Sequence, residues 1–164
     1  MCLTTIKTFP LSSDEKKDVY DTDINKYAEI AKEDIIVYKV LRLKSKFWPA
    51  LSGLSPFQDF KYIISKTYTS KFILSDYSRP YDIYDTPEYH LKIENGLHAY
   101  VNSSNVFMNR TLSSSKPHKV FEMIIPKGSK YFVGTRHDIV SDTLIWPSKF
   151  YFLKQKIKNI LKIS

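Results

Sequence analysis

The alternation of apolar and polar positions is clearest over residues 119–146, where it predicts three consecutive extended segments. Residues 120–125 and 130–133 are rich in β-branched and aromatic side chains, which is typical of strands. Between them, Ile125-Pro126-Lys127-Gly128 supplies the proline and the glycine of a tight turn. We expect a type I turn closed by a bulge there. We also expect the three segments to form the spine onto which the earlier strands pair.

Earlier stretches show the same strand pattern. Residues 35–43 (IIVYKVLRL) predict a strand that is covered on one face and partly on the other. Residues 60–68 (FKYIISKTY) alternate well enough to predict a second strand. Residues 90–93 and 97–101 predict two short strands joined by a turn at Glu94-Asn95-Gly96.

Helical spacing occurs near both ends of the chain. Thr22 is a candidate N-cap for a short helix over residues 23–32, with Ile24, Tyr27, Ala28 and Ala31 on one face. Residues 148–163 repeat apolar side chains at steps of three and four, which predicts an amphipathic helix that begins at Ser148 and carries a lysine-rich polar face.

These elements together predict an α+β fold. We expect a mainly antiparallel, twisted sheet, or two packed sheets, of about six to eight strands, with a short N-terminal helix and a basic C-terminal helix. The length of 164 residues fits a single domain over 1–164. Within it, residues 1–13 are predicted to be a loose arm, residues 35–146 a β-rich body, and residues 148–163 the terminal helix.

The charge of the chain is unevenly distributed. Its net charge is +8, and residues 147–164 hold five lysines and no acidic residue. Residues 35–146 hold fifteen Lys and Arg against nine Asp and Glu, whereas residues 1–34 are net acidic. A basic body and tail permit an anionic partner. The candidate anion-binding or nucleic-acid-binding residues of the predicted terminal helix are Lys154, Lys156, Lys158 and Lys162.

The sequence lacks the motifs of several kinds of functional site. The single cysteine, Cys2, excludes a disulfide within the chain, and the four histidines lack the spacing of a zinc site. There is no glycine-rich phosphate loop and no nucleophile elbow. No apolar stretch reaches the length of a membrane span, and no secretory signal follows the N-terminus, so we expect a cytoplasmic protein without a metal.

Short motifs across the body resemble a recurring pattern. The chain is similar to small uncharacterised proteins of Bacteroidetes bacteria and their phages in these motifs: Tyr38-Lys39, Ser55-Pro56-Phe57-Gln58, Tyr62 with Lys66 and Tyr68, Gly96-Leu97-His98, and Ile125-Pro126-Lys127-Gly128-Ser129-Lys130-Tyr131. This resemblance covers residues 35–146 and implies a shared fold, with no activity to carry over.

More distantly, the order of elements is similar to the ADP-ribosyltransferase fold, which implies an NAD site. Residues 35–43, 97–104 and 138–146 would take the places of its three key strands. The resemblance implies that His98 or Tyr38 positions the nicotinamide ribose and that Asp142 stabilises oxocarbenium-like charge. This chain departs from the pattern, because Tyr38 and Lys39 stand where the family has Arg or His, and aspartate replaces the catalytic glutamate.

Two functions follow as the main expectations, and a third, weaker one makes the lysine-rich tail a membrane-surface anchor. The first is a small non-enzymatic binding or accessory protein, phage- or mobile-element-related, without a cofactor. It would engage an anionic partner such as nucleic acid, or a protein, through a basic, tyrosine-rich face. The alternative is an NAD-binding enzyme like the ADP-ribosyltransferases, or an inactive relative, with His98, Tyr38 and Asp142 as its catalytic residues.

Overall fold

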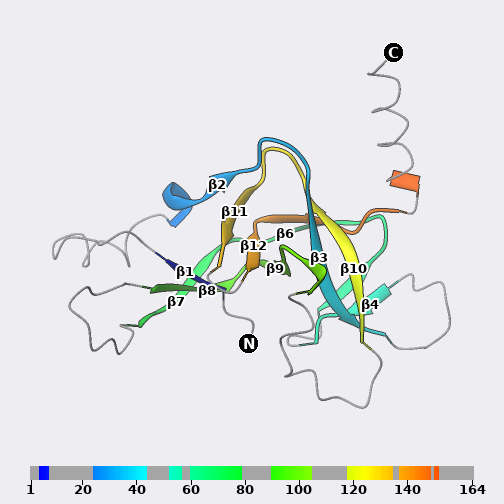
Figure 1. Ribbon diagram of the computed structural model, residues 1–164, viewed down its shortest axis with the longest axis horizontal. Coiled ribbons are helices and arrows are strands. Elements are labelled where there is room, and N and C mark those ends of the chain that lie inside the picture. The colour runs from blue at the N-terminus through cyan, green and yellow to red at the C-terminus, as the bar shows by residue number, and fades with distance from the viewer. Residues whose placement is uncertain are drawn as a thin grey trace.

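The computed structural model of the chain describes residues 4–7, 24–43, 52–56, 60–78, 90–104, 118–134, 137–148 and 150–151. These residues form two antiparallel sheets, one of ten strands and one of three. Figure 1 shows the large sheet as a strongly curved structure in which β3 and β10 run side by side as its longest strands. In chain order the strands are β1 (Thr4–Lys7), β2 (Glu29–Ile30), β3 (Ile35–Arg42), β4 (Ser52–Leu54), β5 (Lys61–Ile63), β6 (Thr67–Thr69), β7 (Ile73–Ser78), β8 (His90–Asn95), β9 (Leu97–Tyr100), β10 (His118–Ile125), β11 (Lys130–Val133), β12 (Asp138–Ser141) and β13 (Thr143–Ile145).

The predicted spine over residues 119–146 is confirmed in part, because four of the nine earlier described strands, β2, β3, β6 and β9, pair with it and the other five pair elsewhere. Strand β10 pairs with β3 along its whole length, from Ile125 opposite Ile35 to His118 opposite Arg42. Strand β11 pairs with β2, β12 with β9, and β13 with β6. The structure divides the third predicted segment at Asp142, so the spine consists of four strands rather than three.

The turn at Pro126–Ser129 differs from the expected one. The N–H of Ser129 donates to the carbonyl of Pro126 at 3.1 Å, which places Lys127 and Gly128 at the central positions. Gly128 has a φ of 87°, as the third residue of a type II turn requires. Strands β10 and β11 are not neighbours in the sheet. The turn therefore connects two strands that pair with different partners and does not close a hairpin. The backbone of Ala31 forms hydrogen bonds with Gly128 and Ser129 at this point.

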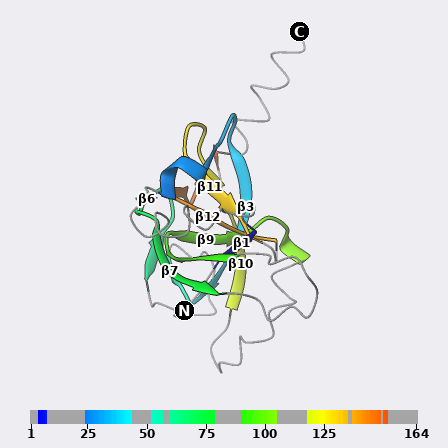
Figure 2. The same cartoon turned by 90° about the vertical axis from the view of Figure 1, so that its left-hand side faces the viewer.

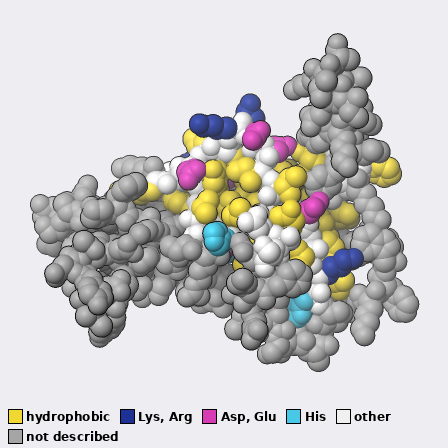
Figure 3. Space-filling model, in the orientation of Figure 1, with side chains coloured by type: hydrophobic (Ala, Val, Ile, Leu, Met, Phe, Trp, Pro, Cys, Tyr) yellow, Lys and Arg dark blue, Asp and Glu magenta, His cyan; other side chains and the backbone are white. Residues whose placement is uncertain are grey.

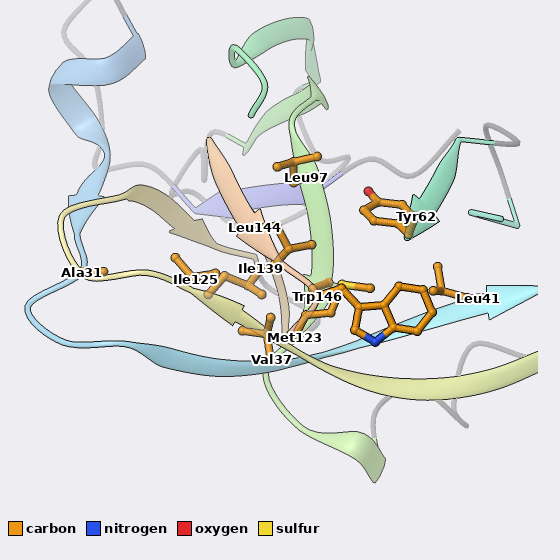
Figure 4. Close-up of a cluster of buried hydrophobic side chains, with 11 residues drawn as sticks. Ala31, Val37, Leu41, Tyr62, Leu97, Met123, Ile125, Ile139, Leu144 and Trp146 are labelled. Atoms are coloured by element: carbon orange, nitrogen blue, oxygen red, sulfur yellow. The ribbon is translucent and has the colours of Figure 1, made fainter. Parts of the chain in front are cut away.

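The inner face of the curved sheet encloses the main hydrophobic core. Strand alternation sends Val37 and Leu41 of β3 to this face, together with Met123 and Ile125 of β10. Figure 4 shows these side chains meeting Ile139, Leu144 and Leu97 from the far side of the sheet, with Tyr62 and Trp146 beside Leu41. Each strand of the spine contributes at least one side chain to this core or to its border, which explains why the spine organises the fold.

A second packed region joins the three-stranded sheet, with the order β1-β8-β7, to the outer face of the large sheet. Figure 2 shows β7 passing in front of β9 and β12, and β1 contacts both β11 and β12. Phe72 meets Phe132 edge-to-face here, with ring centres 5.0 Å apart. Gly96 turns the chain from β8 into β9 with a φ of 135°. The predicted strands on either side of Gly96 are therefore present, but they belong to different sheets.

The α+β class predicted from the sequence is wrong, since the described residues are almost entirely antiparallel sheet. Their helical content is limited to the 3₁₀ turn Ile24–Tyr27 and two-residue pieces at 103–104 and 150–151. The helix expected over residues 23–32 is replaced by that turn and by β2, because Glu29 and Ile30 pair with β11. The thirteen strands also exceed the six to eight expected.

Two further expectations change with the structure. Within the arm expected over residues 1–13, Thr4–Lys7 forms β1 and pairs with β8. The strand expected over residues 60–68 is broken into β5 and β6, because Ser65 between them adopts a φ of 65°. Of the helix expected over residues 148–163, only Ser148, Phe150 and Tyr151 lie within the described residues.

Candidate functional site

Basic side chains outnumber acidic ones in several strand segments of the large sheet. Residues 39–43, 52–56, 60–72 and 118–121 contain no Asp or Glu, although exposed Glu122 follows on β10 and the backbone of Asp142 bonds to Ser70. They contain one arginine and five lysines, of which Lys39 is buried and the other four lysines are exposed. The basic residues are Lys39, Arg42, Lys61, Lys66, Lys71 and Lys119. A local excess of positive charge attracts an anionic partner.

Three of the cationic or titratable side chains in these segments are aligned by strand register. His118 of β10 lies opposite Arg42 of β3, Arg42 lies opposite Leu54 of β4, and Leu54 lies opposite Lys61 of β5. Residues opposite one another in antiparallel strands project from the same face, with Cβ atoms roughly 4.5–5.5 Å apart. We call His118, Arg42 and Lys61 the basic row. It crosses four adjacent strands, a span of about 14 Å from three inter-strand spacings.

Three aromatic rings meet on the core-facing side of β5, the face opposite the one from which Lys61 projects. Phe60 contacts Tyr62 with ring centres 4.9 Å apart and Tyr68 with ring centres 5.6 Å apart. Tyr62 and Tyr68 are 4.8 Å apart, and all three pairs are edge-to-face, the geometry that aromatic rings prefer. We call these three residues the aromatic cluster. Tyr62 is buried and Tyr68 half-buried, while Phe60 is 45% exposed.

Hydrogen bonds hold the aromatic cluster in place. The Tyr68 hydroxyl accepts from the N–H of Ile63 at 2.5 Å and donates to the carbonyl of the same residue at 3.2 Å. Two backbone hydrogen bonds join the turn between β5 and β6 to Trp146. The N–H of Ser65 donates to the Trp146 carbonyl at 2.6 Å, and the N–H of Trp146 donates to the Lys66 carbonyl at 3.1 Å. The carbonyl of Phe60 accepts from Ser55 N–H at 2.8 Å. Both ends of the segment that carries the cluster are thus fixed.

A buried lysine, Lys39, contacts the Tyr62 ring of the aromatic cluster. Lys39 is only 7% exposed, on the core-facing side of β3 between Val37 and Leu41. Its Nζ lies 4.8 Å from the centre of the Tyr62 ring, within the range of a cation–π interaction. The same Nζ donates to the carbonyl of His98. Lys39 thereby links β3, β5 and β9.

Two of the three predicted catalytic residues lie on one face of the sheet. Tyr38 pairs with Tyr100, and His98 lies two positions before Tyr100 on the same strand. Because alternate residues of a strand share a face, Tyr38 and His98 project from the same side. This is the face opposite the main core, where Val140 lies opposite His98 and is fully buried.

The third predicted catalytic residue, Asp142, forms hydrogen bonds with the protein backbone. It lies at the bend between β12 and β13, where its Oδ1 accepts from the N–H of Lys130 at 3.2 Å. Its own N–H donates to the carbonyl of Lys130 at 3.0 Å, and its carbonyl accepts from Ser70 N–H at 2.8 Å. The residue thus holds three segments of backbone together. The catalytic roles assigned to His98, Tyr38 and Asp142 stay a prediction.

The tail lysines Lys154, Lys156, Lys158 and Lys162 lie outside the described residues. In the part of the chain that the structure describes, no group of three or more His, Cys, Asp and Glu side chains is placed to hold a metal ion. Figure 3 shows hydrophobic side chains gathered at the centre of this face, with acidic side chains around them, basic side chains both at the top and at the lower right, and two separate histidines.

The sequence signals for the basic row and the aromatic cluster are weak. Phe60-Lys61-Tyr62 alternates, so its charge and its buried ring are predicted to lie on opposite faces. Nothing in the sequence shows that Lys61 shares a row with Arg42 and His118, because that alignment depends on the order of β10, β3, β4 and β5 in the sheet.

Within the described residues, no helix has the length and apolar character needed to cross a membrane. Comparison of this chain with protein-family models, with curated proteins and with solved structures finds no match. The first resemblance noted in the sequence thus depends on the quoted motifs alone, and the second on the order of elements.

Proposed function

We propose that the protein is a non-enzymatic binding protein that holds the phosphodiester backbone of nucleic acid at the basic row of its large sheet. The observation that carries the proposal is the basic row, which strand register aligns across β10, β3, β4 and β5. Phosphate contacts from Lys and Arg supply most of the sequence-independent affinity of such proteins. An accessory role linked to phages or mobile elements, and a cytoplasmic location, remain part of the proposal.

The surroundings of the row favour an anionic partner. Lys66, Lys71 and Lys119 are exposed on the strand segments that flank the row, where the described basic side chains outnumber the acidic ones. By contrast, Glu29, Glu33 and Asp34 are exposed at the other end of β3, close to the Pro126–Ser129 turn. Among the described residues, acidic side chains are therefore concentrated beside Lys32 and Lys127 at that end and not beside Arg42 and Lys61.

The alternative of an NAD-using enzyme has less support from the geometry. A transferase of that kind needs its carboxylate directed at the ribose, whereas Asp142 already accepts a hydrogen bond from the backbone of Lys130. Calorimetry with NAD tests this alternative directly. Absence of heat at millimolar ligand would remove it.

The test of the proposed function is fluorescence anisotropy of a labelled oligonucleotide over a series of salt concentrations. We expect binding that weakens as salt rises, since each phosphate contact contributes a slope of roughly −0.7 for single strands and −0.9 for duplex DNA in log K against log salt. The double variant Lys61→Gln with Lys66→Gln should weaken binding and make the slope shallower by about one to two contacts.

The matched control removes two exposed lysines near the opposite end of β3. Lys32 and Lys127 lie near Glu33 and Asp34, the acidic residues that precede β3. The double variant Lys32→Gln with Lys127→Gln changes the net charge by the same amount and should leave affinity and salt slope nearly unchanged. Equal losses in both variants, or no binding at low salt, would contradict the proposal.

A further inference from the structure

We infer that Arg42 and His118 hold one phosphate group between them and that His118 takes up a proton from solvent as the phosphate binds. This inference rests on the proposed function and adds how pH regulates the same site. Its starting point is strand register, which places the two residues directly opposite each other on β3 and β10.

The two side chains are close enough to contact the same anion. Residues directly opposite in an antiparallel pair project from one face, with Cβ atoms roughly 4.5–5.5 Å apart. That face is the outer one, because Leu41, the neighbour of Arg42, points into the core. Arg42 and His118 are both half-buried, so each is partly open to solvent. A guanidinium and a protonated imidazole offer only N–H donors, which phosphate oxygens accept.

The charge of His118 makes this contact depend on pH. Histidine is the side chain that ordinarily changes charge between pH 5 and 8, whereas the guanidinium of Arg42 stays positive. Two positive charges directly opposite each other repel, and a phosphate between them reverses that balance because it attracts both. A neutral imidazole therefore gains a proton as phosphate binds, and no bond of the nucleic acid changes. By linkage, a lower pH strengthens the binding of phosphate.

The other titratable side chains around the imidazole are farther away or on the other face. Tyr38 and Glu122 lie opposite each other four residues further along β3 and β10, roughly 13 Å away. Lys61 ends the row on β5, and Lys119 projects from the opposite face of β10. The strand β13, on the other side of β10, carries no titratable side chain. Among the described residues, the guanidinium on β3 is thus the charged group that faces the imidazole directly.

The test measures the affinity of labelled oligothymidine by fluorescence anisotropy at about pH 6 and about pH 8, on either side of the ordinary midpoint of histidine. Oligothymidine keeps its own charge over this range. We expect binding about 2- to 10-fold tighter at the lower pH, the range for one added charge-assisted contact at a partly exposed site. Because one phosphate serves both cations, the salt slope should stay nearly the same at the two pH values.

Two substitutions of His118 give opposite expectations. His118→Gln cannot change charge, so it should bind equally at both pH values, with the affinity that the original chain has at the higher pH. His118→Lys is positive at both pH values and should keep the tighter affinity at both. Calorimetry in buffers of different ionisation enthalpy counts the protons taken up on binding. We expect uptake in the original chain and none in either variant.

His137→Asn is the matched control, because His137 is exposed just before β12 and does not belong to the row. Its φ is 59°, a conformation that asparagine tolerates. This variant should keep both the pH dependence and the proton uptake of the original chain.

The outcomes separate the inference from the proposed function. Equal affinity at both pH values in the original chain, or a pH dependence that persists in His118→Gln, would overturn the inference and leave backbone binding intact. A salt slope steeper by about 0.7 at the lower pH would give His118 a phosphate of its own and overturn the shared site. Failure to bind at low salt at either pH would overturn the proposed function itself.

Discussion

The ammonium nitrogen of Lys39 lies 4.8 Å from the centre of the Tyr62 ring, on the inner side of the large sheet. Burial of a charge is costly unless polar or π-electron partners replace water. The ring and the carbonyl of His98 both serve that purpose here. This relationship connects the supported cluster at β5 with β9, and it has consequences for stability that can be measured.

Substitution of Lys39 tests whether its charge or its volume matters more. Lys39→Met keeps most of the volume and removes the buried charge, so the free energy of unfolding should stay within about 1.5 kcal/mol of the original. Lys39→Ala leaves a cavity beside Tyr62 and should lose roughly 2–4 kcal/mol. Urea denaturation followed by circular dichroism measures both. A loss for Lys39→Met as large as that for Lys39→Ala would show that the charge itself stabilises the core.

The two glycines with positive φ should respond differently to alanine. A Cβ at Gly96 would lie 2.3 Å from Cγ2 of Val140, so Gly96→Ala combines backbone strain with overpacking and should cost roughly 2–5 kcal/mol. A Cβ at Gly128 would meet nothing within 4 Å, so Gly128→Ala should cost only the strain, about 1–2 kcal/mol. Thermal unfolding of the two variants checks the order, and equal losses would contradict the close approach of β9 and β12 at Gly96.

Asp142 should behave as a structural residue. Asp142→Ala removes the acceptor for the N–H of Lys130 and should lower the free energy of unfolding by about 1–3 kcal/mol. Asp142→Asn keeps an oxygen acceptor in the same place, so its loss should be under about 1 kcal/mol. Chemical denaturation of both variants gives the comparison. An alanine variant as stable as the original chain would mean that the carboxylate has no structural role.

Tyr131 gives a pH-dependent contribution with a defined sign. Its hydroxyl donates to Glu29 Oε2 at 2.7 Å, and this hydrogen bond, with burial and the negative charge of Glu29, raises the pKa of Tyr131. The folded state therefore favours the neutral phenol. The resulting stability is fully present below the unfolded pKa of about 10 and is lost as pH rises through the higher folded pKa.

Glu29→Gln tests the cause of that pKa shift. It removes the charge of the acceptor, so the ionisation of Tyr131 should move to lower pH. The difference in phenolate absorbance between each protein and its Tyr131→Phe counterpart isolates this one tyrosine among the twelve. An unchanged midpoint in Glu29→Gln would exclude Glu29 as the main cause.

The long strands were predictable because their signal is local. The apolar runs at β3 and β10 are long and β-branched, so residues 35–43 and 120–125 indicate strands without knowledge of their partners. The Pro126–Gly128 turn was predictable for the same reason. Its role was not, since the backbone of Ala31 occupies the position that a hairpin partner would take.

The helix over residues 23–32 was wrongly predicted because the spacing of its apolar residues fits one face of a helix, although the segment forms a 3₁₀ turn and the strand β2. Glu29 and Ile30 are exposed on an edge strand, and their pairing with β11 outweighs a weak helical preference. The break between β5 and β6 could not be predicted from the sequence either, because serine rarely adopts the positive φ that Ser65 has.

Taken by itself, the sequence determined which segments are extended, where the chain turns, and that its body carries an excess of positive charge. The tertiary structure alone decided that Arg42, Lys61 and His118 form one row, that Lys39 lies against Tyr62, and that Phe60 is supported on two tyrosines. The physical reason is that strand propensity is local, whereas strand order and register are set by burial of a shared core among segments far apart in the chain.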